Sequence, residues 1–257
     1  MRSARRRDRF FLAAALVMVI IVAVGFGPSL YLRSPLGTMD RLTGSPSLPT
    51  HLLVHGVILT AWFSLLAAQT LLVATSRTHV HRWLGWFGAA LVPAVVASSV
   101  VTMQRVVPRI LEARVPVDAN ARAAIFERMA EVVVNDTLTL VVFVAFVGCA
   151  LYFRSMPATH NRLMSLASAK LIAPALSQGR PWGRLLAPHL PQGLLISTVF
   201  VLLFIAALVW HDLAARRRLE PATIWGGAAI IATVAAGFVI QHSQIGVDFT
   251  HWVAGVE

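Results

Sequence analysis

Long apolar runs dominate the order of residues in this chain. A helix needs roughly 20 mainly apolar residues to cross a bilayer, at about 1.5 Å of rise per residue. Seven runs reach or approach that length, at about 10–32, 50–74, 83–105, 132–153, 162–178, 191–212 and 222–242. The pattern predicts an all-α fold, a polytopic transmembrane helix bundle of about seven spans, formed as a single transmembrane domain over residues 1–257.

The composition agrees with a membrane location. Hydrophobic residues make up 57% of the chain, charged residues only 13%, and the mean hydropathy is +0.73. Soluble globular chains carry about 25% charged residues, so this chain has too few polar side chains to cover a water-exposed surface. The expected partner is therefore the lipid bilayer.

The first run follows a basic N-terminal segment, which is also how a secretory signal peptide begins. The run is too long for a signal peptide and no Ala-x-Ala cleavage site follows it, so we expect a retained first helix. Gly25, Gly27 and Pro28 are expected to bend its outer end.

The distribution of arginines predicts the orientation. If all seven segments span, one side carries twelve arginines and three acidic residues, which marks it as cytoplasmic. The short fifth segment contains Ser165, Ser168 and Lys170, so a re-entrant or interfacial helix is the alternative. That alternative would move Arg216–Arg218 outside and weaken the asymmetry. We expect the N-terminus inside, the C-terminus outside, and a bacterial inner membrane.

Several other classes of site are excluded. The net charge is +11, but the basic residues lie at the ends of apolar runs without any nucleic-acid-binding motif, so nucleic acid is not an expected partner. Cys149 is the one cysteine, which rules out an intrachain disulfide.

In the loop over about 106–131, Asp118 is expected to cap a short helix on the membrane surface, with Ile125 and Met129 on one face.

The nine histidines lie mostly at the ends of the predicted spans, in two layers. His51 and His55 are four residues apart, so they share a helix face, as ligands of one metal ion or haem do; the alternative is a pair of interfacial histidines. On the inner side, His81, His160 and His211 are candidates for a cluster that holds haem b between two imidazoles. The alternative there is ordinary interface residues. His189 is a further outer candidate.

Two charges fall within the apolar spans. Asp136 lies in the fourth run and Lys170 near the middle of the fifth. A charge in hydrocarbon costs about 2.5–3.5 kcal/mol on insertion scales unless it is paired or hydrated. The two runs are sequential and antiparallel, so we expect Asp136 and Lys170 to pair inside the bundle, as a structural pair or as a proton or anion site.

Three segments carry a resemblance to known proteins: His51 with His55, His81-Arg82-Trp83-Leu84-Gly85, and His160-Asn161-Arg162-Leu163-Met164 with Pro174-Ala175 beyond. Over about residues 48–178 the chain resembles a group of uncharacterised bacterial multi-pass membrane proteins. The resemblance implies the membrane class and the packing of these segments as one unit. A fainter likeness is to diheme cytochrome b-type transmembrane oxidoreductases, which implies two layers of haem-binding histidines. Here, however, the fourth span has no histidine.

Three functions fit these residues. The first is a membrane redox protein that holds haem or quinone, with His55 and His189 as outer ligands and His81 and His160 as inner ones. The second is a zinc-dependent membrane hydrolase that uses His51, His55, Asp136 and His242. The third is a transporter, or an accessory subunit within a homo-oligomer or a complex with other membrane subunits, in which Asp136 and Lys170 are pathway or packing residues.

Overall fold

A computed structural model describes residues 2–32, 47–113, 118–177, 180–189 and 196–255, without the side chains of residues 2–8 and 187. Within these ranges the chain folds into helices alone. They are α1 (Arg2–Phe26) with a π-helical turn η1 (Gly27–Tyr31), α3 (Thr50–Ala74), α4 (Thr78–Ala113), α5 (Ala119–Tyr152), α6 (Pro157–Lys170), the 3-10 turn η2 (Ala173–Leu176), α7 (Pro181–Leu186), the 3-10 turn η3 (Ala187–His189), α8 (Ile196–Arg216), α9 (Pro221–Gln241) and α10 (Gln244–Ala254).

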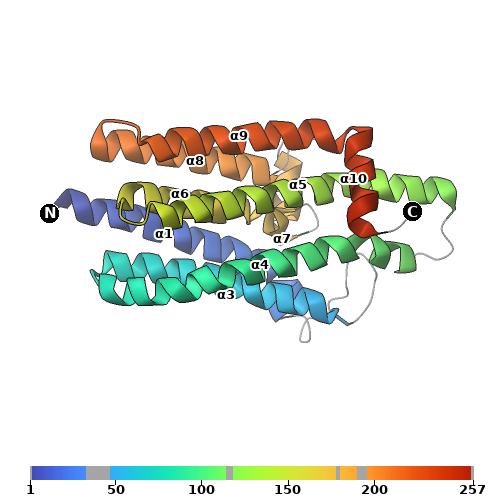
Figure 1. Ribbon diagram of the computed structural model, residues 1–257, viewed down its shortest axis with the longest axis horizontal. Helices are drawn as coiled ribbons and strands as arrows, with labels where there is room; N and C mark the ends of the chain where they lie inside the picture. The colour runs from blue at the N-terminus through green and yellow to red at the C-terminus, as the bar shows by residue number, and fades with distance from the viewer. Residues whose placement is uncertain (1, 33–46, 114–117, 178–179, 190–195, 256–257) are drawn as a thin grey trace.

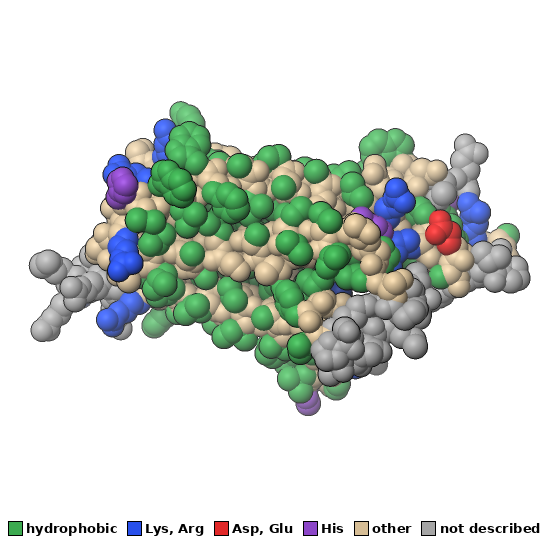
Figure 2. All heavy atoms as spheres, turned by 90° about the horizontal axis from the view of Figure 1, so that it is seen from below, with side chains coloured by type: hydrophobic (Ala, Val, Ile, Leu, Met, Phe, Trp, Pro, Cys, Tyr) green, Lys and Arg blue, Asp and Glu red, His purple; other side chains and the backbone are tan. Residues whose placement is uncertain are grey.

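Six of the described helices are long and apolar enough to cross a membrane: α1 continued into η1, α3, α4, α5, α8 and α9. They run side by side along the longest axis of the molecule (Figure 1). Hydrophobic side chains cover the middle of the face seen in Figure 2, and charged side chains gather towards its two ends. A multi-pass membrane protein, as the apolar runs predict, accounts for this surface.

One end of the bundle, called the basic end below, is formed by the connections at 75–77, 153–156 and 217–220. Figure 1 shows these three connections together with the N-terminus, at the end opposite α10. Exposed arginines lie there, including Arg77, Arg154 and Arg217. The arginine-rich connections therefore share one end, as the charge distribution predicts; the side chains of residues 2–8 lie outside the described part.

The fifth predicted segment, 162–178, is not one continuous spanning helix. α6 has 14 residues, about 21 Å of helix, and it ends at Lys170. Pro174 contributes to this end, because it lacks the amide that would bond to the Lys170 carbonyl. The 3-10 turn η2 follows, with Ala175 and Leu176 buried.

The described parts of α4 and α5 extend well past the predicted spans 83–105 and 132–153. Asp118 does cap a helix, accepting a hydrogen bond from the amide of Ala121 at 2.7 Å, as predicted. That helix does not lie on the membrane surface, because it continues without a break into the fourth span as α5. Met129 packs instead in a small cluster with Val107, Ile110 and Phe126.

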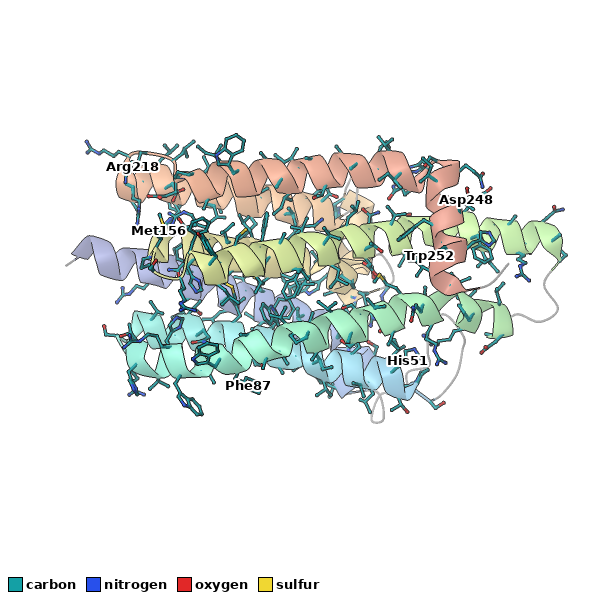
Figure 3. All side chains as sticks on the ribbon, viewed as in Figure 1. His51, Phe87, Met156, Arg218, Asp248 and Trp252 are labelled. Carbon is teal, nitrogen blue, oxygen red and sulfur yellow. The ribbon has the colours of Figure 1, made fainter. Side chains whose placement is uncertain are left out.

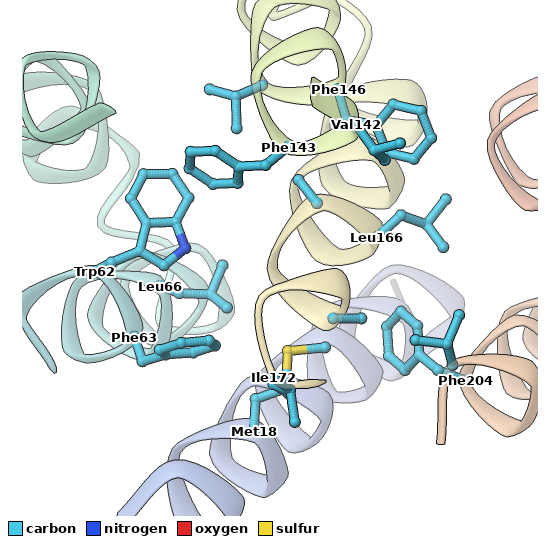
Figure 4. Packing of buried hydrophobic residues seen from close by; sticks show 14 of the residues in the cluster. Met18, Trp62, Phe63, Leu66, Val142, Phe143, Phe146, Leu166, Ile172 and Phe204 are labelled. Carbon is cyan, nitrogen blue, oxygen red and sulfur yellow. The ribbon is translucent and has the colours of Figure 1, made fainter. Parts of the chain in front are cut away.

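The main hydrophobic core lies where α1, α3, α5, α6 and α8 meet (Figure 4). Trp62 of α3 and Phe143 of α5 pack edge to face, with ring centroids 4.9 Å apart. The Trp62 indole also donates a hydrogen bond to the Ser168 hydroxyl of α6 at 3.2 Å. Met18 of α1 is 1% exposed and belongs to the same cluster. These contacts hold the short helix α6 in the middle of the bundle.

Large aromatic side chains are exposed towards the basic end, namely those of Trp83, Trp86, Tyr152, Trp210 and Trp225. Trp182, by contrast, is partly buried. Its indole donates a hydrogen bond to the Ile21 carbonyl at 2.9 Å, and its side chain packs against the core.

Gly25 permits a close approach between α1 and η2. A Cβ atom at Gly25 would lie 2.6 Å from the Ala175 carbonyl oxygen. We predict that Gly25→Ala lowers the stability of the protein by about 1–3 kcal/mol, because rigid backbone on both sides would have to move. Thermal unfolding in detergent measures the change. Gly148→Ala is the matched control, since a Cβ at that helical glycine meets nothing within 4 Å. Equal melting temperatures for the two variants would contradict the prediction.

Candidate functional site

A small, partly open pocket with a mostly apolar surface lies between α3, α4, α5 and the segment that follows α6. Its volume is about 60 Å³, enough for one or two water molecules or a small ion. Five of its lining residues carry polar side chains: His55, Ser99, Thr102, Asp136 and Thr139. Leu59, Met103, Leu140, Leu171 and Pro174 complete the lining. The pocket thus brings together two of the candidate residues from the sequence, His55 and Asp136.

The His55 ring is held by α4. Its Nδ1 lies 3.1 Å from the Ser98 hydroxyl, and that hydroxyl donates to the Val95 carbonyl at 3.2 Å. Because the Ser98 hydroxyl donates its proton to the Val95 carbonyl, its oxygen can only accept from His55, so the Nδ1 atom of His55 carries the hydrogen. In a neutral ring this leaves Nε2 as an acceptor.

Asp136 and Lys170 lie at a similar depth in the bundle. Asp136 precedes the end of α5 by 16 residues, about 24 Å from the basic end, and Lys170 follows the start of α6 by 13 residues, about 20 Å. Asp136 is half-buried and Lys170 is 9% exposed. The two charges act on each other electrostatically, although no ion pair within 4 Å joins them among the described salt bridges.

The end of α6 adds a further polar feature beside the pocket. The last carbonyl groups of a helix carry partial negative charge, and a basic side chain in the last turn complements it. Lys170 occupies that last turn, and Leu171 and Pro174 lie in the pocket wall. The pocket therefore combines a carboxylate, hydroxyl groups, an imidazole and a helix end, with one ammonium group nearby.

Two inner histidines are neighbours, as predicted. The ring centroids of His81, at the start of α4, and His160, at the start of α6, are 6.3 Å apart. His160 donates from Nδ1 to the Ala150 carbonyl at 2.8 Å. The Nδ1 atom of His81 and Oε1 of Gln69 are both buried, and neither has a hydrogen-bond partner among the described residues. This pair is the second cluster of candidate site residues.

The remaining candidates lie elsewhere. The His211 ring stacks on Phe10 of α1, with centroids 4.3 Å apart, so its described ring contacts are with α1 rather than with His81 or His160. His51 shares a face of α3 with His55, and its Nε2 is buried without a partner. His189 is exposed in η3. His242 bonds to the Phe238 carbonyl of its own helix at 2.8 Å.

Metal-ligand geometry gives no support to a zinc hydrolase. Among the described residues, no three His, Cys, Asp or Glu side chains gather as a metal site requires. The set His51, His55, Asp136 and His242 is thus not assembled around one point in this part of the chain.

A buried ion pair at the basic end was not predicted. Arg162 of α6 and Asp212 of α8 form a direct salt bridge, and the two side chains are 1% and 0% exposed. Asp212 also accepts from the Thr223 hydroxyl at 2.6 Å and from the Glu220 amide at 3.2 Å. Arg162 further donates to the Ala158 carbonyl at 2.7 Å. The pair therefore ties α6, α8 and α9 together.

No protein-family model, curated protein or solved structure matches this chain. The resemblances to bacterial multi-pass membrane proteins and to diheme cytochromes remain predictions. Function is therefore inferred from the chemistry of the described side chains and from their positions in the bundle.

We predict that Asp212→Ala destabilises the protein by about 3–5 kcal/mol, because it leaves the Arg162 guanidinium buried without a counter-charge. Thermal unfolding in detergent measures the loss. Arg154→Ala, at an exposed arginine of the same end, is the control and is expected to change stability by less than about 1 kcal/mol. The double variant Arg162→Leu with Asp212→Leu is expected to recover part of the loss. A double variant less stable than Asp212→Ala would contradict this account.

Proposed function

We propose that this protein is a transport protein of the membrane, and that the ion it carries or uses for coupling is a proton bound at Asp136. The observation that carries the proposal is a small pocket between the spanning helices, to which Asp136 contributes a carboxylate and which is bordered by the broken end of α6. An ionisable residue within a membrane-spanning bundle that lines a cavity marks a pathway for ions or substrate.

The chemistry of the pocket favours a proton over an anion. Asp136 supplies a carboxylate, and Ser99, Thr102 and Thr139 supply hydroxyl oxygens. His55 offers Nε2 as an acceptor when its Nδ1–H is bonded to Ser98. Water in the pocket can connect these groups and pass a proton between them. Lys170 is then the intramembrane partner of Asp136, and its positive charge stabilises the deprotonated carboxylate across the intervening space.

The interruption of α6 supports the same proposal. Irregular backbone at membrane depth is tolerated where it is buried in protein or lines a cavity, and discontinuous helices of this kind surround the binding sites of many transporters. The segment after Lys170 meets both conditions, because Ala175 is buried and Leu171 and Pro174 line the pocket.

The orientation forms part of the proposal. The exposed arginines at the basic end support a cytoplasmic position for that end, with the N-terminus inside and α10 outside. The chain then crosses seven times, with α6, η2 and α7 together making the fifth crossing. A bacterial inner membrane is the proposed location.

We predict that Asp136→Asn abolishes proton entry into liposomes that contain the purified protein. The neutral amide keeps the shape of the carboxyl group but cannot bind and release a proton. A potassium diffusion potential drives the flux, and a trapped pH-sensitive dye reports it. Infrared difference spectroscopy gives a second measurement. A pH jump is expected to produce a carboxyl band from Asp136 in the parent protein, and this band is expected to be missing from the Asp136→Asn variant.

Glu127→Gln is the matched control, because Glu127 is an exposed carboxylate of the same helix, far from the pocket. It is expected to keep both the flux and the band. A flux that is equal in the parent protein and in Asp136→Asn, or no greater than in empty liposomes, would refute proton transport at this site.

A second candidate function, a haem-linked or quinone-linked redox protein, rests on the pair His81 and His160. Metal-bound histidines commonly donate the other ring N–H to a carbonyl, as His160 does to Ala150, which leaves Nε2 for a metal. His81 contributes a buried ring nitrogen without a partner. These two residues would hold haem b, which supplies one-electron transfer when bound.

For this second function we predict that the purified protein shows a Soret absorption band, and that the band is lost in His81→Ala and in His160→Ala because each variant lacks an axial ligand. His79→Ala, at an exposed histidine of the same helix, is expected to keep it. A colourless protein, produced in cells supplied with haem precursor, would exclude haem at this pair.

A further inference from the structure

The last described helix, α10, differs in direction from the other long helices. Figure 1 shows it crossing α4 and α5 nearly at right angles to the bundle, at the end opposite the N-terminus. Its inner face is well packed: Gly246 and Thr250 are buried, and the His251 ring stacks on Phe126 of α5 with centroids 3.6 Å apart. Val247 and Ala254 pack on the cluster formed by Val107, Ile110, Phe126 and Met129.

The opposite face of α10 carries large apolar side chains. Ile245 is 71% exposed and Trp252 is 77% exposed, and the Phe249 ring stacks on Trp252 with centroids 5.8 Å apart. At 100° per residue these three positions fall within one narrow stripe of the helix. Gln244 and Asp248, which bond to each other at 2.8 Å, form an adjacent polar stripe. Asp248 and Trp252 are both labelled on α10 in Figure 3.

Helix lengths locate α10 relative to a bilayer. α9 has 21 residues, about 31 Å, which equals the thickness of the hydrocarbon core. Since α9 starts at the basic end, its last residue, Gln241, reaches the opposite boundary. Phe126 precedes the end of α5 by 26 residues, about 39 Å from the basic end. α10 therefore packs about 8 Å beyond the end of α9, at the level of the lipid head groups.

The apolar face of α10 continues the lipid-facing surface of α9, where Phe238 is 65% exposed and Val239 is 69% exposed. At the basic end, five exposed aromatic residues mark the other boundary. Trp and Tyr are enriched at both interfaces of membrane proteins, because their rings are amphipathic. Trp252 occupies the corresponding position at the far boundary.

From these observations we infer that α10 is an interfacial helix, whose stripe of Ile245, Phe249 and Trp252 binds the lipid at the boundary between head groups and acyl chains. Amphipathic helices lie in this plane with their apolar side about 5–10 Å deep. The ends of α4 and α5 beyond α10 then project from the membrane as a two-helix extension into water. This inference is independent of the pocket at Asp136.

Spin labels at single cysteines test the inference in liposomes of zwitterionic lipid. The parent is full-length protein with Cys149→Ser, which removes the one native cysteine. Labels are placed by Trp252→Cys and, independently, by Ile245→Cys. Ile231→Cys is the acyl-chain control, in the middle of α9, and Asn120→Cys is the water control, on the part of α5 that extends beyond α10. Collision rates are measured with oxygen, which concentrates among acyl chains, and with a water-soluble nickel chelate.

The labels at 252 and 245 are expected to collide with nickel severalfold less often than the label at 120, and with oxygen at a rate between those at 120 and 231. Nickel collision equal to that at 120 would overturn the inference, because α10 would then stand in water. Low collision with both reagents at both positions would also overturn it, since a second copy of the chain would then cover the stripe. Melting temperatures equal to that of the parent show that the labelled variants remain folded.

Discussion

Backbone hydrogen bonding in lipid is the constraint on which this structure depends. An amide or carbonyl group that faces hydrocarbon without a partner costs several kcal/mol, so a helix that stops at membrane depth must stop inside protein. α6 stops at Lys170, and the turn that follows is enclosed by its neighbours: Ala175 lies against Gly25 of α1, and Leu176 is 4% exposed. The arrangement of helices around α6 is thus required by the break within it.

The regular part of the fold could be predicted from the sequence, because length and apolar composition decide whether a helix spans. α1, α3, α8 and α9 lie close to the predicted runs, although residues 191–195 of the sixth run lie outside the described part. The true lengths of α4 and α5 could not be obtained in the same way. Their outer ends are stabilised by packing on α10, where Phe126 stacks on His251, and that contact joins residues 125 positions apart.

The candidate site was predictable only as far as it depends on spacing within one helix or on the antiparallel packing of consecutive helices. The spacing of His51 and His55 places both on one face of a helix, and antiparallel neighbours bring Asp136 and Lys170 to a similar depth. That His55 shares a pocket with Asp136 depends on how α3 packs against α5, which no local pattern encodes. The pairing of Arg162 with Asp212 was missed because each is an ordinary charge at a span end when considered alone. The interruption at Pro174 had a local signal, a proline within a short and polar run.

The two groups of charged residues in the bundle differ in how completely they are satisfied. Asp212 is bonded to Arg162, to the Thr223 hydroxyl and to the Glu220 amide, so its charge is fully compensated and fixed in place. A network of that kind stabilises one arrangement of helices. Asp136 lies instead beside a cavity, with Lys170 close enough to influence it but without a direct ion pair among the described contacts. A carboxylate held in this incomplete state keeps the capacity to take up and release a proton, and this difference is the reason that we propose a functional role for Asp136 and a structural role for Asp212.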